Sequence, residues 1–246
     1  MTIVAVTCDA AFPRKGESRY RGARLPRVTW DEHAEREERR YADALARLPD
    51  AADPRQKQLV RAAMAAGGAG LARLMQGRGA EAAGWFARSA ERYRESWPDA
   101  PPGSWGRLIG ALKARVLAGD WEGAEADARW ALEQDPAGSD SPIGAYAAGL
   151  ARLILGDDPA AVELGARLSA AGENAFPAPV AQALAGLAGG DPERYGAGCA
   201  AVLASFESRE DYLEDVPVAD TVIVLEALAD RRGMATHPQS RLLPGA

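Results

Sequence analysis

From Gln56 onward, stretches of alanine, leucine, arginine and glutamate of helical length are separated at regular intervals by glycine or proline. This pattern is typical of helices joined by tight turns, and it predicts stacked helical hairpins. A further helix is expected before them, because Thr29-Trp30-Asp31-Glu32 has the form of a capped helix start and a run with helical propensity follows it to Leu48. Pro49 to Pro54 interrupts that run. We therefore expect one all-α domain over residues 29–246.

One segment resembles the second half of a tetratricopeptide repeat. It runs from Gly119-Asp120-Trp121 to Asp135-Pro136, with small residues at Ala124, Ala128 and Ala131 that allow paired helices to approach closely. The glycine turns at Gly77, Gly119, Gly156 and Gly190 lie 42, 37 and 34 residues apart, near the repeat period of about 34. The sequence thus predicts antiparallel helical hairpins stacked as a degenerate tetratricopeptide-like array, with the apolar segment Thr221 to Ala229 packed on the last hairpin.

Residues 1–28 differ from the rest of the chain. A short apolar run at Thr2 to Val6 fits a short strand or an extended arm, and a glycine-containing basic stretch follows it. Its basic residues accompany no recognition helix, zinc finger or RNA-binding signature, so an arm docked on the acidic body is favoured over nucleic-acid binding. The run lacks the features of a signal peptide, and Val216 to Ala229 is too short and too charged to span a bilayer. We expect no membrane partner and a cytoplasmic protein.

The formal net charge of −6 is unevenly distributed. Residues 1–61 carry 13 Lys and Arg against 10 Asp and Glu, which leaves 16 against 25 for residues 62–246. An acidic body favours solubility, and it also favours basic partners. The acidic residues considered for partner binding are Glu207, Glu210, Asp211, Glu214, Asp215 and Asp220, and also Glu122, Glu125 and Asp127. The same acids fit a solvated helix end, or a hydrolase if two of them faced each other across a cleft.

Residues that would carry catalytic or cofactor chemistry are sparse. Cys8 and Cys199 lie far apart with no CxxC pair, and His33 and His237 stand in no metal or catalytic motif, so we expect both histidines to be exposed. The cluster Gly67-Gly68-Ala69-Gly70 lacks a following Lys-Ser/Thr and fits close helix contact better than phosphate binding. No catalytic residue, cofactor or metal is predicted. Trp105 and Trp121 could line a peptide groove, although packing between repeats is favoured.

Both ends of the chain carry short motifs of one known family. These are Met1-Thr2-Ile3-Val4-Ala5-Val6 with Phe12-Pro13, then Gly190-Asp191-Pro192-Glu193-Arg194-Tyr195, Tyr212-Leu213, Val218-Ala219-Asp220-Thr221-Val222-Ile223-Val224-Leu225, Ala227-Leu228-Ala229 and Ser240-Arg241-Leu242-Leu243-Pro244. On these segments, about half of the chain, the protein resembles the immunity protein 49 family of bacterial polymorphic-toxin systems. The resemblance implies an α-helical antitoxin that binds a cognate toxin, with no catalytic residues to carry over.

Three functional hypotheses follow. The first is an immunity-type protein whose acidic surface occludes a basic toxin domain. The second is a tetratricopeptide-like scaffold that holds a peptide on its concave side. The third is an enzyme that uses a helical frame, for instance within a biosynthetic cluster, because fold alone does not fix function. None of them leads to an expectation for the oligomeric state.

Overall fold

The computed structural model describes residues 29–172, 174–212 and 216–245. This part of the chain is all-α and contains no strand, which confirms the predicted fold class. The strand or arm expected in residues 1–28 lies outside the described residues. The helices are α1 (Trp30–Ala46), α2 (Ala52–Met75), α3 (Gly79–Glu95), α4 (Gly106–Leu117), α5 (Trp121–Glu133), η1 (Pro136–Gly138), α6 (Pro142–Leu155), α7 (Asp158–Ala170), α8 (Ala178–Gly189), α9 (Pro192–Glu207) and α10 (Asp220–Asp230).

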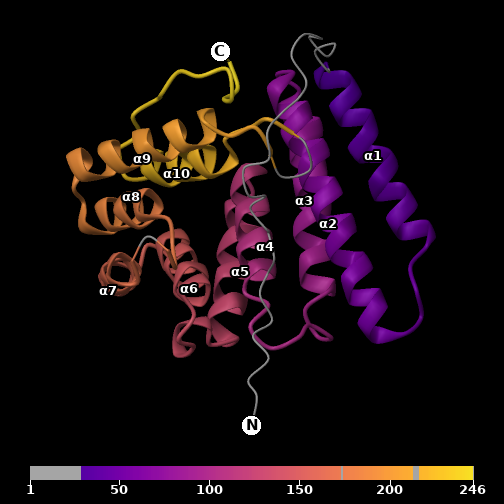
Figure 1. Ribbon diagram of the computed structural model, residues 1–246, viewed down its shortest axis with the longest axis horizontal. Coiled ribbons are helices and arrows are strands. Elements are labelled where there is room, and N and C mark those ends of the chain that lie inside the picture. Colours follow the sequence, from indigo (N-terminus) through magenta and orange to yellow (C-terminus); the bar gives the residue numbers. More distant parts are fainter. Residues whose placement is uncertain (1–28, 173, 213–215, 246) are drawn as a thin grey trace, which may run out of the picture.

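Four helical hairpins form the stack, α2 with α3, α4 with α5, α6 with α7 and α8 with α9 (Figure 1). The turn of each hairpin contains one of the predicted glycines, Gly77, Gly119, Gly156 or Gly190, and all four have positive φ angles between 62° and 72°. L-residues with a Cβ rarely adopt this conformation, so glycine is the residue that allows each helix to end and the chain to reverse. The predicted hairpin turns are therefore confirmed.

Helix α1 precedes the first hairpin and packs on α2. Its capping box is present, because the backbone N–H of Glu32 donates to Thr29 Oγ1 at 3.3 Å and the Glu32 carboxylate accepts from the Thr29 N–H at 2.7 Å. The expectation that His33 is exposed was wrong. His33 is only 6% exposed and lies on the buried face of α1, with its ring centroid 5.5 Å from that of Trp30.

Small residues bring the paired helices close together, as predicted. Ala124, Ala128 and Ala131 are fully buried. A Cβ atom added to Gly70 would lie 2.6 Å from the ring of Phe86, which shows how closely α2 and α3 approach. The glycine cluster therefore serves helix contact, because a larger residue at Gly70 would push the Phe86 ring away.

Helix α10 packs on the last hairpin, as expected, and also reaches back to α4 in the middle of the stack (Figure 1). The C-terminal segment after α10 returns to the start of that helix, since the N–H of Ala219 donates to the carbonyl of Leu242 at 2.9 Å. Leu242 and Leu243 are buried. The first residues of α10 are thus placed beside α4, and this contact builds the site described below.

Glu226 of α10 anchors this C-terminal segment. Its carboxylate accepts hydrogen bonds from the Tyr195 hydroxyl, from the N–H and hydroxyl of Thr236, both at 2.9 Å, and from the N–H of His237 at 2.7 Å. Burial alone would raise the pKa of Glu226, but these donors stabilise the charged form and hold its pKa below the ordinary 4.5.

This lowered pKa predicts a loss of stability in acid. Because the folded protein holds the Glu226 pKa below its unfolded value, the carboxylate stabilises the fold above about pH 4.5, and that contribution is lost as pH falls through the folded value. We expect the free energy of unfolding of Glu226→Gln to fall less steeply than that of the wild type between pH 6 and pH 3 in urea titrations. Parallel pH profiles for the two proteins would contradict this role of Glu226.

Candidate functional site

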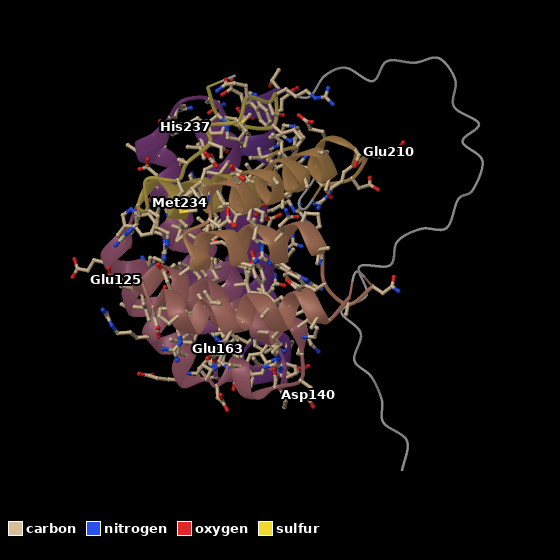
Figure 2. The ribbon with its side chains drawn as sticks, turned by 90° about the vertical axis from the view of Figure 1, so that its left-hand side faces the viewer. Glu125, Asp140, Glu163, Glu210, Met234 and His237 are labelled. Atoms are coloured by element: carbon tan, nitrogen blue, oxygen red, sulfur yellow. The ribbon has the colours of Figure 1, made fainter. Side chains whose placement is uncertain are left out.

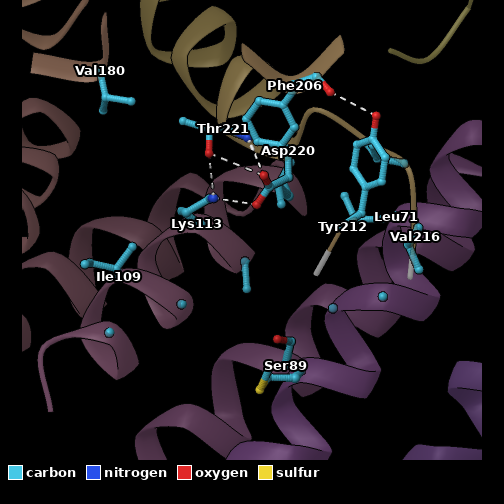
Figure 3. Close-up of a pocket in the computed structure, with 18 of the residues that line it drawn as sticks. Leu71, Ser89, Ile109, Lys113, Val180, Phe206, Tyr212, Val216, Asp220 and Thr221 are labelled. Atoms are coloured by element: carbon cyan, nitrogen blue, oxygen red, sulfur yellow. Dashed lines mark hydrogen bonds and ion pairs between the residues drawn. The ribbon is translucent and has the colours of Figure 1, made fainter. Parts of the chain in front are cut away.

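A partly open cleft of about 490 Å³ lies between the two halves of the stack. One wall comes from α2, α3 and α4, and the other from α9, the segment that follows it and the start of α10. Helix α6 and the beginning of α8 contribute further lining residues. Figure 3 shows α2 and α3 on one side of this space and the labelled residues of α9 and α10 on the other. The volume falls in the range of about 300 to 1,000 Å³ that is common for ligand sites.

The walls of the cleft are mostly apolar. Gly67 and Gly110 leave room for the lining side chains of neighbouring helices, and a Cβ atom on Gly110 would lie 2.4 Å from the ring of Tyr93. At the edge of the cleft Ile143 is 40% exposed, an unusual exposure for a large aliphatic side chain of this protein. Further apolar residues that line the cleft are Leu71, Phe86, Ile109, Leu117, Val180 and Val216.

A closed group of three polar side chains sits within these walls. Lys113 of α4 forms an ion pair with Asp220 of α10, and its ammonium donates to Thr221 Oγ1 at 3.1 Å. Asp220 Oδ1 in turn accepts from the backbone N–H of Thr221 at 2.7 Å and from its hydroxyl at 3.3 Å. Figure 3 shows these bonds linking Lys113, Asp220 and Thr221 to one another. The three residues satisfy one another and join α4 to α10.

The environment keeps Lys113 protonated. Burial alone would lower its pKa, but the charge of the Asp220 carboxylate and the hydrogen bond to it outweigh burial, and the pKa of Lys113 lies above its ordinary value. Burial raises the pKa of Tyr146, so its phenol stays neutral at physiological pH. A protonated lysine in an ion pair is neither a nucleophile nor a base. The group is therefore a fixed polar contact in an apolar cleft.

Arg209 supplies a second cation to the lining. It follows the C-terminal end of α9, and its guanidinium carbon lies 3.9 Å from the centroid of the Phe206 ring. Its remaining side-chain contact is a weak hydrogen bond of 3.5 Å to Ser205 Oγ. Among the described residues Arg209 has no ion-pair partner, and its charge is near enough to oppose the protonation of Lys113.

Two of the acidic residues considered for partner binding are engaged inside the protein. Asp127 has a side chain only 3% exposed, paired with Arg94 and, at 3.1 Å, with Arg115. Asp220 belongs to the cleft and pairs with Lys113. Neither presents a free negative charge to a partner, because arginine or lysine from a neighbouring helix neutralises it. The expectation of an exposed surface that includes these two residues is corrected accordingly.

The other described acids do not form one continuous surface. Figure 2 shows Glu125 and Glu210 on opposite sides of the view. Glu125 pairs with Arg129 at 3.2 Å and with Arg231 at 3.7 Å. Glu207 accepts a hydrogen bond from Ser240 at 2.7 Å. The remaining described acids, Glu122, Glu210 and Asp211, are exposed, whereas Glu214 and Asp215 lie outside the described residues.

The two tryptophans of the alternative peptide groove lie away from the cleft lining. Trp105 packs against the main core with its ring centroid 6.0 Å from that of Trp97. Trp121 also packs against this core, and the guanidinium of Arg231 lies 4.3 Å above its ring. Both side chains therefore act in packing, and the cleft in this structure is lined by other residues.

Sequence reasoning missed the residues that make the cleft, above all Lys113, Tyr146, Phe206 and Arg209. Lys113 is the lysine of α4, Gly106 to Leu117, which is rich in alanine and leucine and also contains Arg107 and Arg115. A lysine on the apolar face of a helix needs a buried partner. That signal could have marked Lys113, but nothing local pointed to Asp220 as the partner.

Within residues 29–172, 174–212 and 216–245, no group of three or more His, Cys, Asp or Glu residues is placed to hold a metal ion. No helix in the same ranges is both long and apolar enough to cross a bilayer. Comparisons with protein-family models, with curated proteins and with solved structures find no match for the chain.

Proposed function

We propose that this protein is an immunity-type binding protein, which neutralises a protein toxin by holding an apolar segment of that toxin in the cleft. The observation that carries the proposal is the cleft itself, a partly open apolar space of about 490 Å³ between α2 to α4 and α9 to α10. Helical proteins commonly recognise partners by burying an apolar segment in such a groove. The resemblance to the immunity protein 49 family supports a toxin as the partner.

Binding accounts for the cleft better than catalysis does. Among the described residues, the ionisable side chains of its lining are Lys113, Asp220, Arg209 and the tyrosines, and Lys113 and Asp220 neutralise each other. A hydrolytic site would require two facing carboxylates or a nucleophile with an adjacent base. Among the described lining residues Asp220 is the one carboxylate, and it is held by Lys113 and Thr221.

The overall charge suits a basic toxin domain. With 35 acidic against 29 basic residues, the protein attracts cationic partners at long range, while affinity comes from the apolar contact in the cleft. On this proposal the protein acts in the bacterial cytoplasm, where it blocks the toxin by covering its surface.

Two exposed aliphatic residues offer a matched test. Ile143 at the cleft is 40% exposed, and Val162 on α7, outside the cleft lining, is 43% exposed. We expect Ile143→Glu to weaken binding of the partner toxin by at least about tenfold, since docking would bury an unpaired charge. Val162→Glu should bind as the wild type does. Calorimetry with the purified toxin domain measures both affinities.

Cell growth provides the second measurement. Cells that express the toxin should grow when the wild-type protein or Val162→Glu is co-expressed, and should be arrested with Ile143→Glu. Circular dichroism melting of the two variants checks that both are folded. The proposal fails if the wild-type protein neither binds nor protects, or if both variants bind the toxin equally well.

A further inference from the structure

Arg209 gives the cleft an unbalanced charge. The charged residues among the described lining residues are Lys113, Asp220 and Arg209, and the ion pair between the first two leaves one positive charge over. Lys113 cannot release Asp220 to Arg209, because Lys113 is the more enclosed of the two cations and depends on that carboxylate. Among the described lining residues, Arg209 therefore carries an unpaired positive charge on an exposed side chain.

The position of Arg209 makes its guanidinium a defined binding group. The guanidinium carbon lies 3.9 Å from the centroid of the Phe206 ring, and the backbone N–H of Arg209 donates to the Phe206 carbonyl at 3.2 Å, which fixes the backbone at the end of α9. The ring of Phe206 is also held, since this side chain is only 7% exposed. Because the Arg209 side chain is exposed, N–H groups of its guanidinium remain available, and two of them in parallel match the two oxygens of a carboxylate.

A partner that covers the cleft changes the environment of this cation. An apolar segment seated there would remove water from Arg209, and a cation that loses water without gaining a partner is strongly disfavoured. Tight binding therefore requires an anion on the segment or a guanidinium that stays at the rim. Since the guanidinium of Arg209 already lies over the ring of Phe206, and both residues line the cleft, the first arrangement fits the contacts better.

We propose that the segment that enters the cleft carries a carboxylate among its apolar side chains and that this carboxylate binds the edge of the Arg209 guanidinium. The inference rests on the proposed function and specifies the chemistry of the partner at the same site. On this inference the inserted segment is apolar with one acidic residue. The basic residues of the toxin would then lie on the rest of its surface.

Overlapping peptides that cover the toxin domain test this inference, each made in its natural form and with its Asp or Glu residues replaced by Asn or Gln. Fluorescence anisotropy gives the dissociation constants. We expect one apolar, acid-containing peptide to bind, and we expect its amide form to bind about tenfold more weakly, the usual loss for one charge-assisted hydrogen bond. Arg209→Gln should weaken the binding of the acidic peptide by a similar factor and leave the affinity for the amide peptide unchanged.

The non-additive pattern separates a direct contact from a general loss of fold. Arg129→Gln is the matched control, because Arg129 is 62% exposed and pairs with Glu125 outside the cleft. The carboxylate contact would be overturned if Arg209→Gln weakened the binding of both peptides equally, or if the wild-type protein bound the acidic and amide peptides equally well. Binding of the whole toxin domain would still support the proposed function in either case. Saturable binding of dodecanoate that abolishes peptide binding would also overturn it, in favour of a small amphipathic anion.

Discussion

Gly198→Ala is expected to lower the free energy of unfolding by about 2 to 3 kcal/mol, because α8 and α9 cross with almost no space between their backbones. A Cβ atom on Gly198 would lie 2.5 Å from the backbone nitrogen of Ala183, and one on Gly186 would lie 2.4 Å from that of Tyr195. The two glycines thus fit against the opposite helix in a reciprocal way. Backbone atoms cannot turn aside as a side chain can, so the helices must separate.

A matched control for this prediction is Gly84→Ala on α3. Gly84 is exposed within its helix, and an added Cβ would meet nothing closer than the end of Arg88 at 3.9 Å. Alanine there should raise the stability by up to about 1 kcal/mol through its higher helix propensity. Urea unfolding measures both variants. Equal stability of Gly198→Ala and the wild type would mean that the α8 and α9 crossing is looser than described.

Asp127→Ala is expected to cost about 3 kcal/mol, the lower end of the range for breaking a buried ion pair. Asp127 lies between Arg94 and Arg115, and the Arg94 guanidinium also lies 4.4 Å above the ring of Trp130. Removing the carboxylate leaves two cations together with no shared anion. We place the expectation at the lower end because the side chain of Arg94 is 38% exposed and keeps part of its hydration.

The neighbouring acid on the same helix provides the comparison. Glu125 has a side chain 36% exposed and pairs with arginines that are more exposed still. Glu125→Ala should therefore change the stability by no more than about 1 kcal/mol. Thermal and urea unfolding of the two alanine variants give the difference, and a similar loss for both would show that Asp127 is no more important than a surface acid.

The sequence predicted the features that depend on neighbouring residues. The capped start at Thr29 and the four hairpin glycines follow from local backbone conformation, and the buried alanines of α5 follow from the need of paired helices to approach. These signals lie within a few residues of the structure they specify. The all-α array could for this reason be predicted without any knowledge of the tertiary contacts.

The cleft could not be predicted in this way, because its residues come from distant parts of the chain. Lys113 and Asp220 are 107 residues apart in sequence, and the residues around either one do not indicate that it pairs with the other. The engagement of two of the acidic residues inside the protein could not be predicted for a related reason. A count of charges does not show which carboxylates are neutralised by arginine or lysine from another helix, as Asp127 is by Arg94 and Arg115.

The contact between α10 and α4 changes how the stack behaves as a whole. In a simple helical array each unit touches only its neighbours, so the ends can fray independently. Here the last helix is bonded to the middle of the array through Lys113, Asp220 and Thr221. The last hairpin cannot separate from the array unless these bonds between α10 and α4 break. We therefore expect hydrogen exchange to show α4, α8, α9 and α10 unfolding as a single cooperative unit.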